Sequence, residues 1–148
     1  MAHKGKFKPK NPQKYRGNTS NITYRSGWER QCMMWFDSSP TVLEWNSEGA
    51  VVRYISPVDG ESHRYFIDFY AKIKRSDGLV ENLLIEVKPF KQTQEPKPRK
   101  RKTMASINEE NTWKVNDAKW KAARKVAESL GWKFMIVTEY ELGIAKHK

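Results

Sequence analysis

Two carboxylates and a lysine stand at a spacing that suits metal-assisted chemistry on a phosphate. Asp68 lies in one expected strand, and Glu86-Val87-Lys88 lies in the next, beyond a turn at Ser76-Asp77-Gly78. Carboxylate oxygens are preferred ligands of hard divalent cations, and a nearby positive group can stabilise the charge that develops on a phosphate. These residue types therefore indicate metal-dependent cleavage of phosphodiester bonds.

The turn decides whether the two carboxylates meet. In a hairpin about residues 76–78, residues whose numbers sum to about 154 face each other. Asp68 then lies opposite Glu86, while Glu86 and Lys88 share a face, about 6.6 Å apart along the strand. Two facing carboxylates repel unless a cation lies between them. An ordinary solvent-facing cluster of these three residues is the alternative that spacing alone leaves open.

Glu29 is a further acidic candidate. Ser26-Gly27-Trp28-Glu29 fits a capping box, in which a glutamate binds the start of its own helix. Taken alone, Glu29 therefore has a structural explanation. One carboxylate can serve both the cap and a site, so Glu29 stays a candidate beside Asp68 and Glu86.

The elements that must position these residues follow a simple order. We expect a helix over 26–36, strands over 42–45, 51–55, 63–74 and 79–88, a helix from Asn111 or Thr112 to Leu130, and a strand over 133–138. Alternation along 63–74 puts one core-facing side opposite Asp68, made of Tyr65, Ile67, Phe69, Ala71 and Ile73. This order predicts an α/β fold, in which a mixed sheet is flanked by helices.

Positive charge is concentrated in two segments. Residues 1–16 carry six Lys and Arg and no acid, and residues 88–102 carry seven against Glu95 alone. Each segment contributes +6 to a total of +11, so the rest of the chain is nearly neutral. Nucleic acid is the expected partner; a membrane is not, because no apolar run could span a bilayer and neither segment is an amphipathic helix.

Length and composition give the expected organisation. The chain of 148 residues fits a flexible basic arm over 1–20 and one domain over 21–148 with a basic loop at 89–111. Cys32 is the only cysteine, so a reducing cytoplasmic compartment is favoured. His3, His63 and His147 show no metal-ligand spacing and are expected at the surface. The loop's basic side chains are expected to bind DNA phosphates: Lys97, Arg99, Lys100, Arg101 and Lys102.

Three short stretches carry a resemblance to a known superfamily. They are Ser26-Gly27-Trp28-Glu29-Arg30, Ile67-Asp68-Phe69 and Ile85-Glu86-Val87-Lys88-Pro89. With the order α-β-β-β-α-β, they resemble the PD-(D/E)xK, or restriction endonuclease-like, nucleases, and within these the N-terminal domain of TnsA-type endonucleases. The small size, the basic arm and the closing stretch over 132–139 resemble the head completion nucleases of T-even-type tailed phages. Ile67 departs from the motif, which has proline there.

The resemblance implies a role for each site residue. Asp68, Glu86 and the backbone carbonyl of Val87 would bind Mg²⁺, with Mn²⁺ as a possible replacement. Lys88 would position the attacking water and stabilise the phosphate, and Glu29 would complete the site by holding a water or a second metal ion.

The resemblance also implies a biological setting. The chain would be a metal-dependent DNA endonuclease that processes DNA ends after packaging, with phage capsid or portal proteins as partners. It would act in the host cytoplasm during phage assembly or in the virion head. A non-catalytic DNA-binding head or connector protein, and a branched-DNA resolvase on the same fold, are the alternatives.

Overall fold

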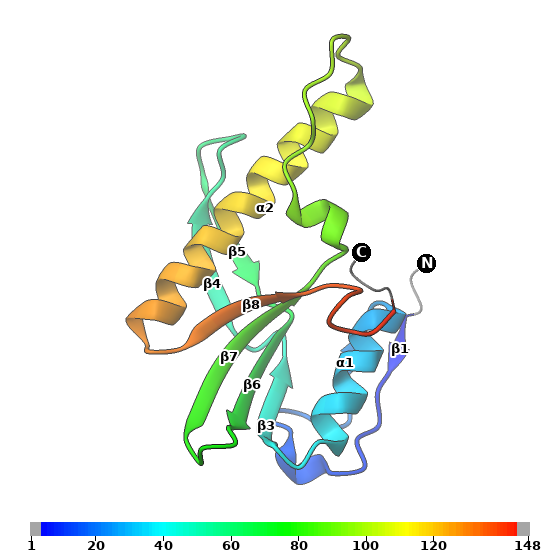
Figure 1. Ribbon diagram of the computed structural model, residues 1–148, viewed down its shortest axis with the longest axis vertical. Helices are drawn as coiled ribbons and strands as arrows, with labels where there is room; N and C mark the ends of the chain where they lie inside the picture. Colours follow the sequence, from blue (N-terminus) through cyan, green and yellow to red (C-terminus); the bar gives the residue numbers. More distant parts are fainter. Residues whose placement is uncertain (1–3, 145–148) are drawn as a thin grey trace.

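The computed structural model describes residues 4–144 as a mixed α/β structure (Figure 1). The first elements are β1 (Gly5–Lys6), the 3₁₀ turn η1 (Pro12–Lys14), β2 (Thr23–Tyr24), α1 (Gly27–Ser38) and β3 (Val42–Ser47). They are followed by β4 (Val51–Ile55), β5 (Ser62–Phe66), β6 (Phe69–Lys74), β7 (Val80–Val87) and η2 (Phe90–Thr93). The chain continues through α2 (Met104–Ser129) and β8 (Lys133–Val137).

A four-stranded mixed sheet forms the centre, in the order β3-β6-β7-β8. β6 is antiparallel to β3 and β7, and β8 is parallel to β7. The long α2 supplies the crossover that a parallel pair needs. The predicted mixed sheet with flanking helices is confirmed.

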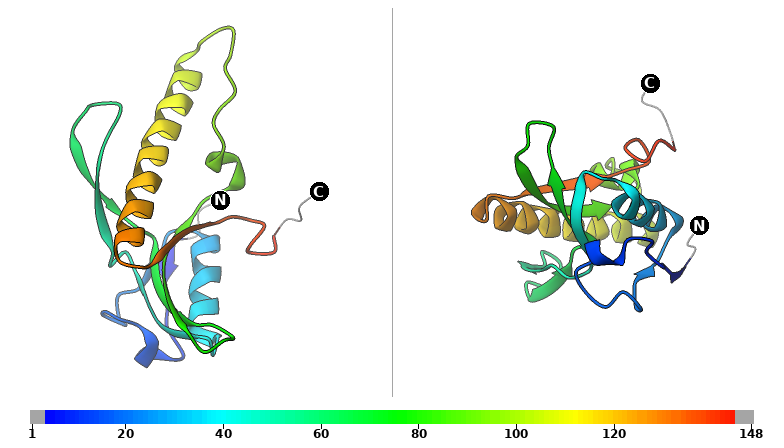
Figure 2. Two further views of the ribbon diagram at one scale, coloured as in Figure 1. Left: turned by 60° about the vertical axis from the view of Figure 1, so that its left-hand side comes forward. Right: turned by 90° about the horizontal axis from the view of Figure 1, so that it is seen from below.

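Each face of the sheet is covered by one helix, because the strands bury side chains on both faces (Figure 2). On one face, Cys32, Met33 and Phe36 of α1 pack with apolar residues of the strands, namely Val42, Trp45, Phe69, Ala71, Leu83 and Ile85. On the other face, Trp120, Ala123 and Ala127 of α2 pack with Leu84, Phe134 and Ile136. The result is a helix-sheet-helix layering.

The strand expected over 63–74 is wrong as one strand. The chain forms β5 up to Phe66, and β6 begins only at Phe69, so Ile67 and Asp68 belong to neither strand. Among the strands of the described chain, β5 pairs only with β4, and this separate ribbon lies against α2. The expected single core-facing side is therefore divided: Tyr65 and Ile67 pack under α2, whereas Phe69 and Ala71 pack under α1.

The second helix begins earlier than expected. Thr103 caps α2, and its hydroxyl accepts from Ser106 N while Ser106 Oγ accepts from Thr103 N, at 3.1 and 2.9 Å. The prediction of a start at Asn111 or Thr112 is wrong, and so is the length of the irregular segment, which ends at Thr103. This capping box uses serine where glutamate or glutamine is usual.

The basic segment before α1 is packed in its described part. Phe7 is buried in the core under α1, and the carboxylate of Asp37 accepts from the backbone N–H groups of Lys10 and Asn11 at 2.8 and 2.9 Å. These contacts hold residues that composition alone assigned to a flexible arm.

Candidate active site

The predicted site residues come from four places around the break between β5 and β6. Glu29 lies in the first turn of α1, Asp68 lies at the break, and Glu86 is the penultimate residue of β7. Lys88 follows β7, where its backbone N–H donates to Val137 O at 3.0 Å. The candidate residues thus come from the start of α1, the β5–β6 break and the end of β7.

The hairpin register brings the carboxylates together as predicted. Phe69 pairs with Ile85 and Tyr70 with Leu84, so the same register places Asp68 beside Glu86. Asp68 Oδ2 accepts a hydrogen bond from Val87 N at 2.9 Å, and Asp68 O accepts from Glu48 N at 3.0 Å. Backbone N–H groups therefore hold both the carboxylate and the main-chain carbonyl of Asp68.

The carboxyl of Asp68 has a pKa well above its ordinary value. Burial, followed by the charge of Glu86, raises the pKa of Asp68 from 3.8 to about 7, although the Val87 N–H and the charge of Lys88 act in the opposite direction. A carboxyl in this state is only partly ionised near neutral pH. A bound cation would restore its charged form, since an opposite charge favours ionisation.

Glu86 is the buried member of the pair. Only 6 % of Glu86 is exposed, and its Oε1 has no hydrogen-bond partner within residues 4–144. The Tyr65 hydroxyl and Trp120 Nε1 are likewise buried without a partner there, and burial and the charge of Glu86 raise the pKa of Tyr65. Buried carboxylates normally have partners, so this oxygen fits the donor set of a hard cation.

Glu29 caps its helix and also faces the acidic pair. Ser26 Oγ accepts from Glu29 N at 3.1 Å, and Glu29 Oε1 accepts from Arg25 N at 3.3 Å, one residue before the cap expected from the sequence. Burial and the charge of Asp68 raise the pKa of Glu29. Glu29 therefore caps its helix and also lies close enough to Asp68 for their charges to interact. Both roles considered for Glu29 are compatible with this position.

The basic run lies away from this point. Lys97, Arg99, Lys100, Arg101 and Lys102 are all exposed, and Lys102 Nζ pairs with Glu110 at 2.9 Å. Figure 1 shows the chain rising from η2 along α2 to the end of that helix farthest from the sheet. The run therefore sits at the tip of α2 and not beside Lys88, because the helix starts as early as Met104.

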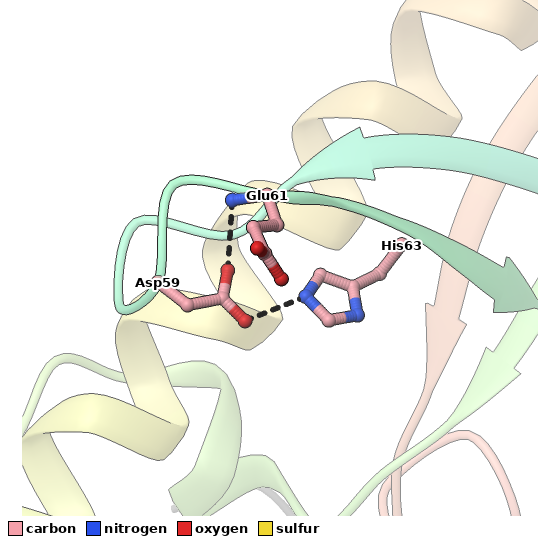
Figure 3. Close-up of side chains that lie close together, drawn as sticks. All are labelled: Asp59, Glu61 and His63. Atoms are coloured by element: carbon pink, nitrogen blue, oxygen red, sulfur yellow. Dashed lines mark hydrogen bonds and ion pairs between the residues drawn. The ribbon is translucent and has the colours of Figure 1, made fainter.

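A second acidic group lies on the β4–β5 turn (Figure 3). Asp59, Glu61 and His63 have potential metal-ligand atoms within 4.8 Å of one another. Because they are alternate residues, their side chains can lie on the same side of the chain. The sequence analysis did not identify this grouping around His63. Asp59 accepts from Glu61 N at 2.9 Å and pairs with His63 Nε2 at 2.7 Å. These internal bonds account for the exposed cluster, and they lower the pKa of Asp59.

Comparison with known proteins places the chain in a family. Residues 39–139 match the family described as TnsA-like endonuclease N terminal, a span that contains Asp68, Glu86 and Lys88 and excludes Glu29. The chain is 46 % identical over 143 residues to the head completion nuclease of Enterobacteria phage T4, covering 94 % of this chain and 93 % of that protein. Within the described residues, no helix is long and apolar enough to cross a membrane. The family match covers more than half of the chain, which therefore belongs to the TnsA-like endonuclease N-terminal family.

Proposed function

We propose that this protein is a metal-dependent DNA endonuclease that acts in phage head completion. The observation that carries the proposal is the buried, unpartnered Oε1 of Glu86 beside Asp68, whose own pKa is raised by burial and by that neighbour. The similarity to a head completion nuclease supplies the biological setting. Processing of DNA ends after packaging, with a capsid or portal protein as partner, is part of the same proposal. So is its place of action, the host cytoplasm during assembly or the virion head.

The donor set fits a hard divalent cation. Asp68, Glu86 and the backbone carbonyl of Val87 would hold Mg²⁺, because these are the oxygen ligands that such an ion prefers. When bound, the ion would polarise the scissile phosphate and lower the pKa of a water molecule. Positioning of the attacking water, stabilisation of the phosphate charge and proton transfer would be the roles of Lys88 and Glu29.

Lys88 is the proposed phosphate-binding group. Its charge acts to lower the pKa of Asp68, against the larger effects of burial and Glu86, and Lys88 forms no ion pair with an acid of residues 4–144. Lys88 would orient the attacking water and stabilise the negative charge that develops on the phosphate. Glu29 would accept a proton from, or hold, a water at the edge of the site, since burial and the charge of Asp68 raise the pKa of its carboxyl and so make it a better proton acceptor.

Cleavage of plasmid DNA with Mg²⁺, with Mn²⁺ and with a chelator tests the proposal. The variants Asp68→Asn, Glu86→Gln and Lys88→Ala should each lower cleavage at least about a hundredfold. Glu81→Gln is the matched control, because Glu81 lies at the other end of β7, where it pairs with Lys133. Cleavage at the wild-type rate by any of the three site variants would refute its assignment.

The same assay separates the alternatives. DNA binding without cleavage under any metal condition would favour a non-catalytic head or connector protein. Preferential cutting of a four-way junction over linear duplex would favour a resolvase. Equal cutting of both substrates supports the general endonuclease proposed here.

A further inference from the structure

The β4–β5 ribbon has an exposed side that the packing of the domain does not explain. Alternation divides the ribbon into an inner side, where Val52 and Tyr65 are buried under α2, and an outer side that is exposed. We call this the outer ribbon face; it consists of Val51, Arg53, Ile55, Ser62, Arg64 and Phe66. In Figures 1 and 2 the ribbon stands beside α2.

Two arginines lie directly opposite each other on this face. Arg53 is the register partner of Arg64 in the antiparallel pair, a placement that destabilises a sheet through like-charge repulsion. Neither arginine forms an ion pair with a carboxylate of the described chain. The pair therefore presents a double positive charge with no counter-charge, as a polyanion would require.

The side chains around the pair are arranged for contact with a partner. The guanidinium of Arg64 lies 5.4 Å from the ring centre of Phe66, which holds it against the ribbon. Among residues 4–144, Arg53 Nη1 donates to Ser62 Oγ alone, over a long 3.4 Å. Val51, Ile55 and Phe66 are 47, 61 and 45 % exposed. Cationic groups beside apolar side chains suit phosphates and the sugar and base edges between them.

The ribbon also leads directly into the candidate active site. Ile67 N donates to Ala50 O at 3.0 Å, and Glu48 N donates to Asp68 O at 3.0 Å, so hydrogen bonding between the two segments continues past the ribbon to the site. Arg64 is four residues before Asp68, at most about 13 Å along the chain at roughly 3.3 Å per residue. One turn of duplex DNA is about 34 Å long, so a single duplex can reach both.

We propose that the outer ribbon face binds the phosphate backbone of duplex DNA through Arg53 and Arg64, within one helical turn of the phosphate that is cleaved. This inference rests on the proposed function as a DNA endonuclease. It adds a second contact surface, separate from the metal ligands and from the basic run at the tip of α2.

The test measures binding of a fluorescent 30-base-pair duplex in the presence of chelator, over a range of salt concentrations. The double variant Arg53→Gln/Arg64→Gln should bind about tenfold or more weakly at low salt, and its slope of log affinity against log salt should fall by about 2. Arg53→Lys/Arg64→Lys, which keeps both charges, should retain most of the slope.

The matched control is Arg75→Ala/Lys133→Ala, which removes the same charge at the opposite end of the sheet. Arg75 pairs with Asp77 beyond β6, and Lys133 pairs with Glu81 at the start of β7. A loss of affinity in the Gln variant that is no larger than in this control would overturn the inference while leaving the nuclease proposal intact. Absence of DNA binding by the unaltered protein would also overturn the inference, whereas the nuclease proposal is decided separately by the cleavage assay.

Discussion

Replacing Asp68 with asparagine should make the metal-free protein more stable near neutral pH. Asp68 is pressed against Glu86 in a buried setting, which raises its pKa from 3.8 to about 7. Asparagine removes the charge and keeps an oxygen that can accept from Val87 N, the bond that now measures 2.9 Å. The substitution therefore removes repulsion without removing the backbone contact.

Proton linkage gives the direction in which the free energy of unfolding changes with pH. An acid whose pKa is higher in the folded state than in the unfolded state binds more protons when folded, so the free energy of unfolding falls as pH rises between the two values. For Asp68 the loss begins near pH 4 and is complete above about pH 7. Wild-type protein without metal should thus lose stability across this window, and Asp68→Asn should lose less.

The size of the effect is a few kcal/mol. A difference of about three pKa units, at about 1.4 kcal/mol each, gives an upper bound of about 4 kcal/mol. Sharing of charge with Glu86 and partial access of water lower the expected value to about 2–3 kcal/mol. In a chain of this length, that corresponds to a rise in Tm of about 5–10 °C.

Thermal unfolding at pH 5 and pH 8, with chelator and with Mg²⁺, measures this. Asp68→Asn should exceed wild type at pH 8 with chelator and approach it at pH 5, while Mg²⁺ should raise the Tm of wild type alone. Asp117→Asn, which loses an exposed ion pair with Lys121, is the control and should change stability by less than about 1 kcal/mol. A lower Tm for Asp68→Asn at pH 8 would show that the two carboxylates do not repel each other in the folded protein.

Three further outcomes follow from the structure. Glu29→Gln should keep the Tm within about 2 °C, because an amide oxygen can still accept from Arg25 N, while cleavage falls at least tenfold. Ser26→Ala should lower the free energy of unfolding by about 1 kcal/mol through loss of the helix cap, a change that urea unfolding measures; retention of full stability would contradict the role of this cap. Neutralising Lys100 and Arg101 together should lower the salt dependence of duplex binding and leave the Tm unchanged, since both side chains are exposed at the tip of α2.

The meeting of Asp68 and Glu86 could be predicted because it depends on local information. A turn at Ser76-Asp77-Gly78 fixes the register, and strand alternation then fixes which side chains share a face. The superfamily resemblance added Glu29, whose cap pattern alone pointed to a structural role. The pairing of Asp68 with Glu86 required no knowledge of the helices.

The break after Phe66 could not be predicted, because apolar residues alternate without interruption from Tyr65 to Ile73. A period of two shows that a side chain is buried but does not show which core buries it. The start of α2 was hidden for another reason: residues 107–109 are exposed and give no apolar stripe, and the cap at Thr103 lacks the usual glutamate.

The break is also what makes the site possible. Ile67 is fully buried in the core under α2, and Phe69 is fully buried in the core under α1, so the backbone must turn from one layer to the other between them. Asp68 occupies the residue at which this turn occurs, and its side chain is left at the junction of the layers, facing the end of β7. A continuous strand would have placed Asp68 on an ordinary sheet face, where its side chain could have been solvated and its pKa would have stayed low. The two cores therefore hold the Asp68 carboxylate against Glu86 despite their repulsion, and a cation bound between them would relieve it.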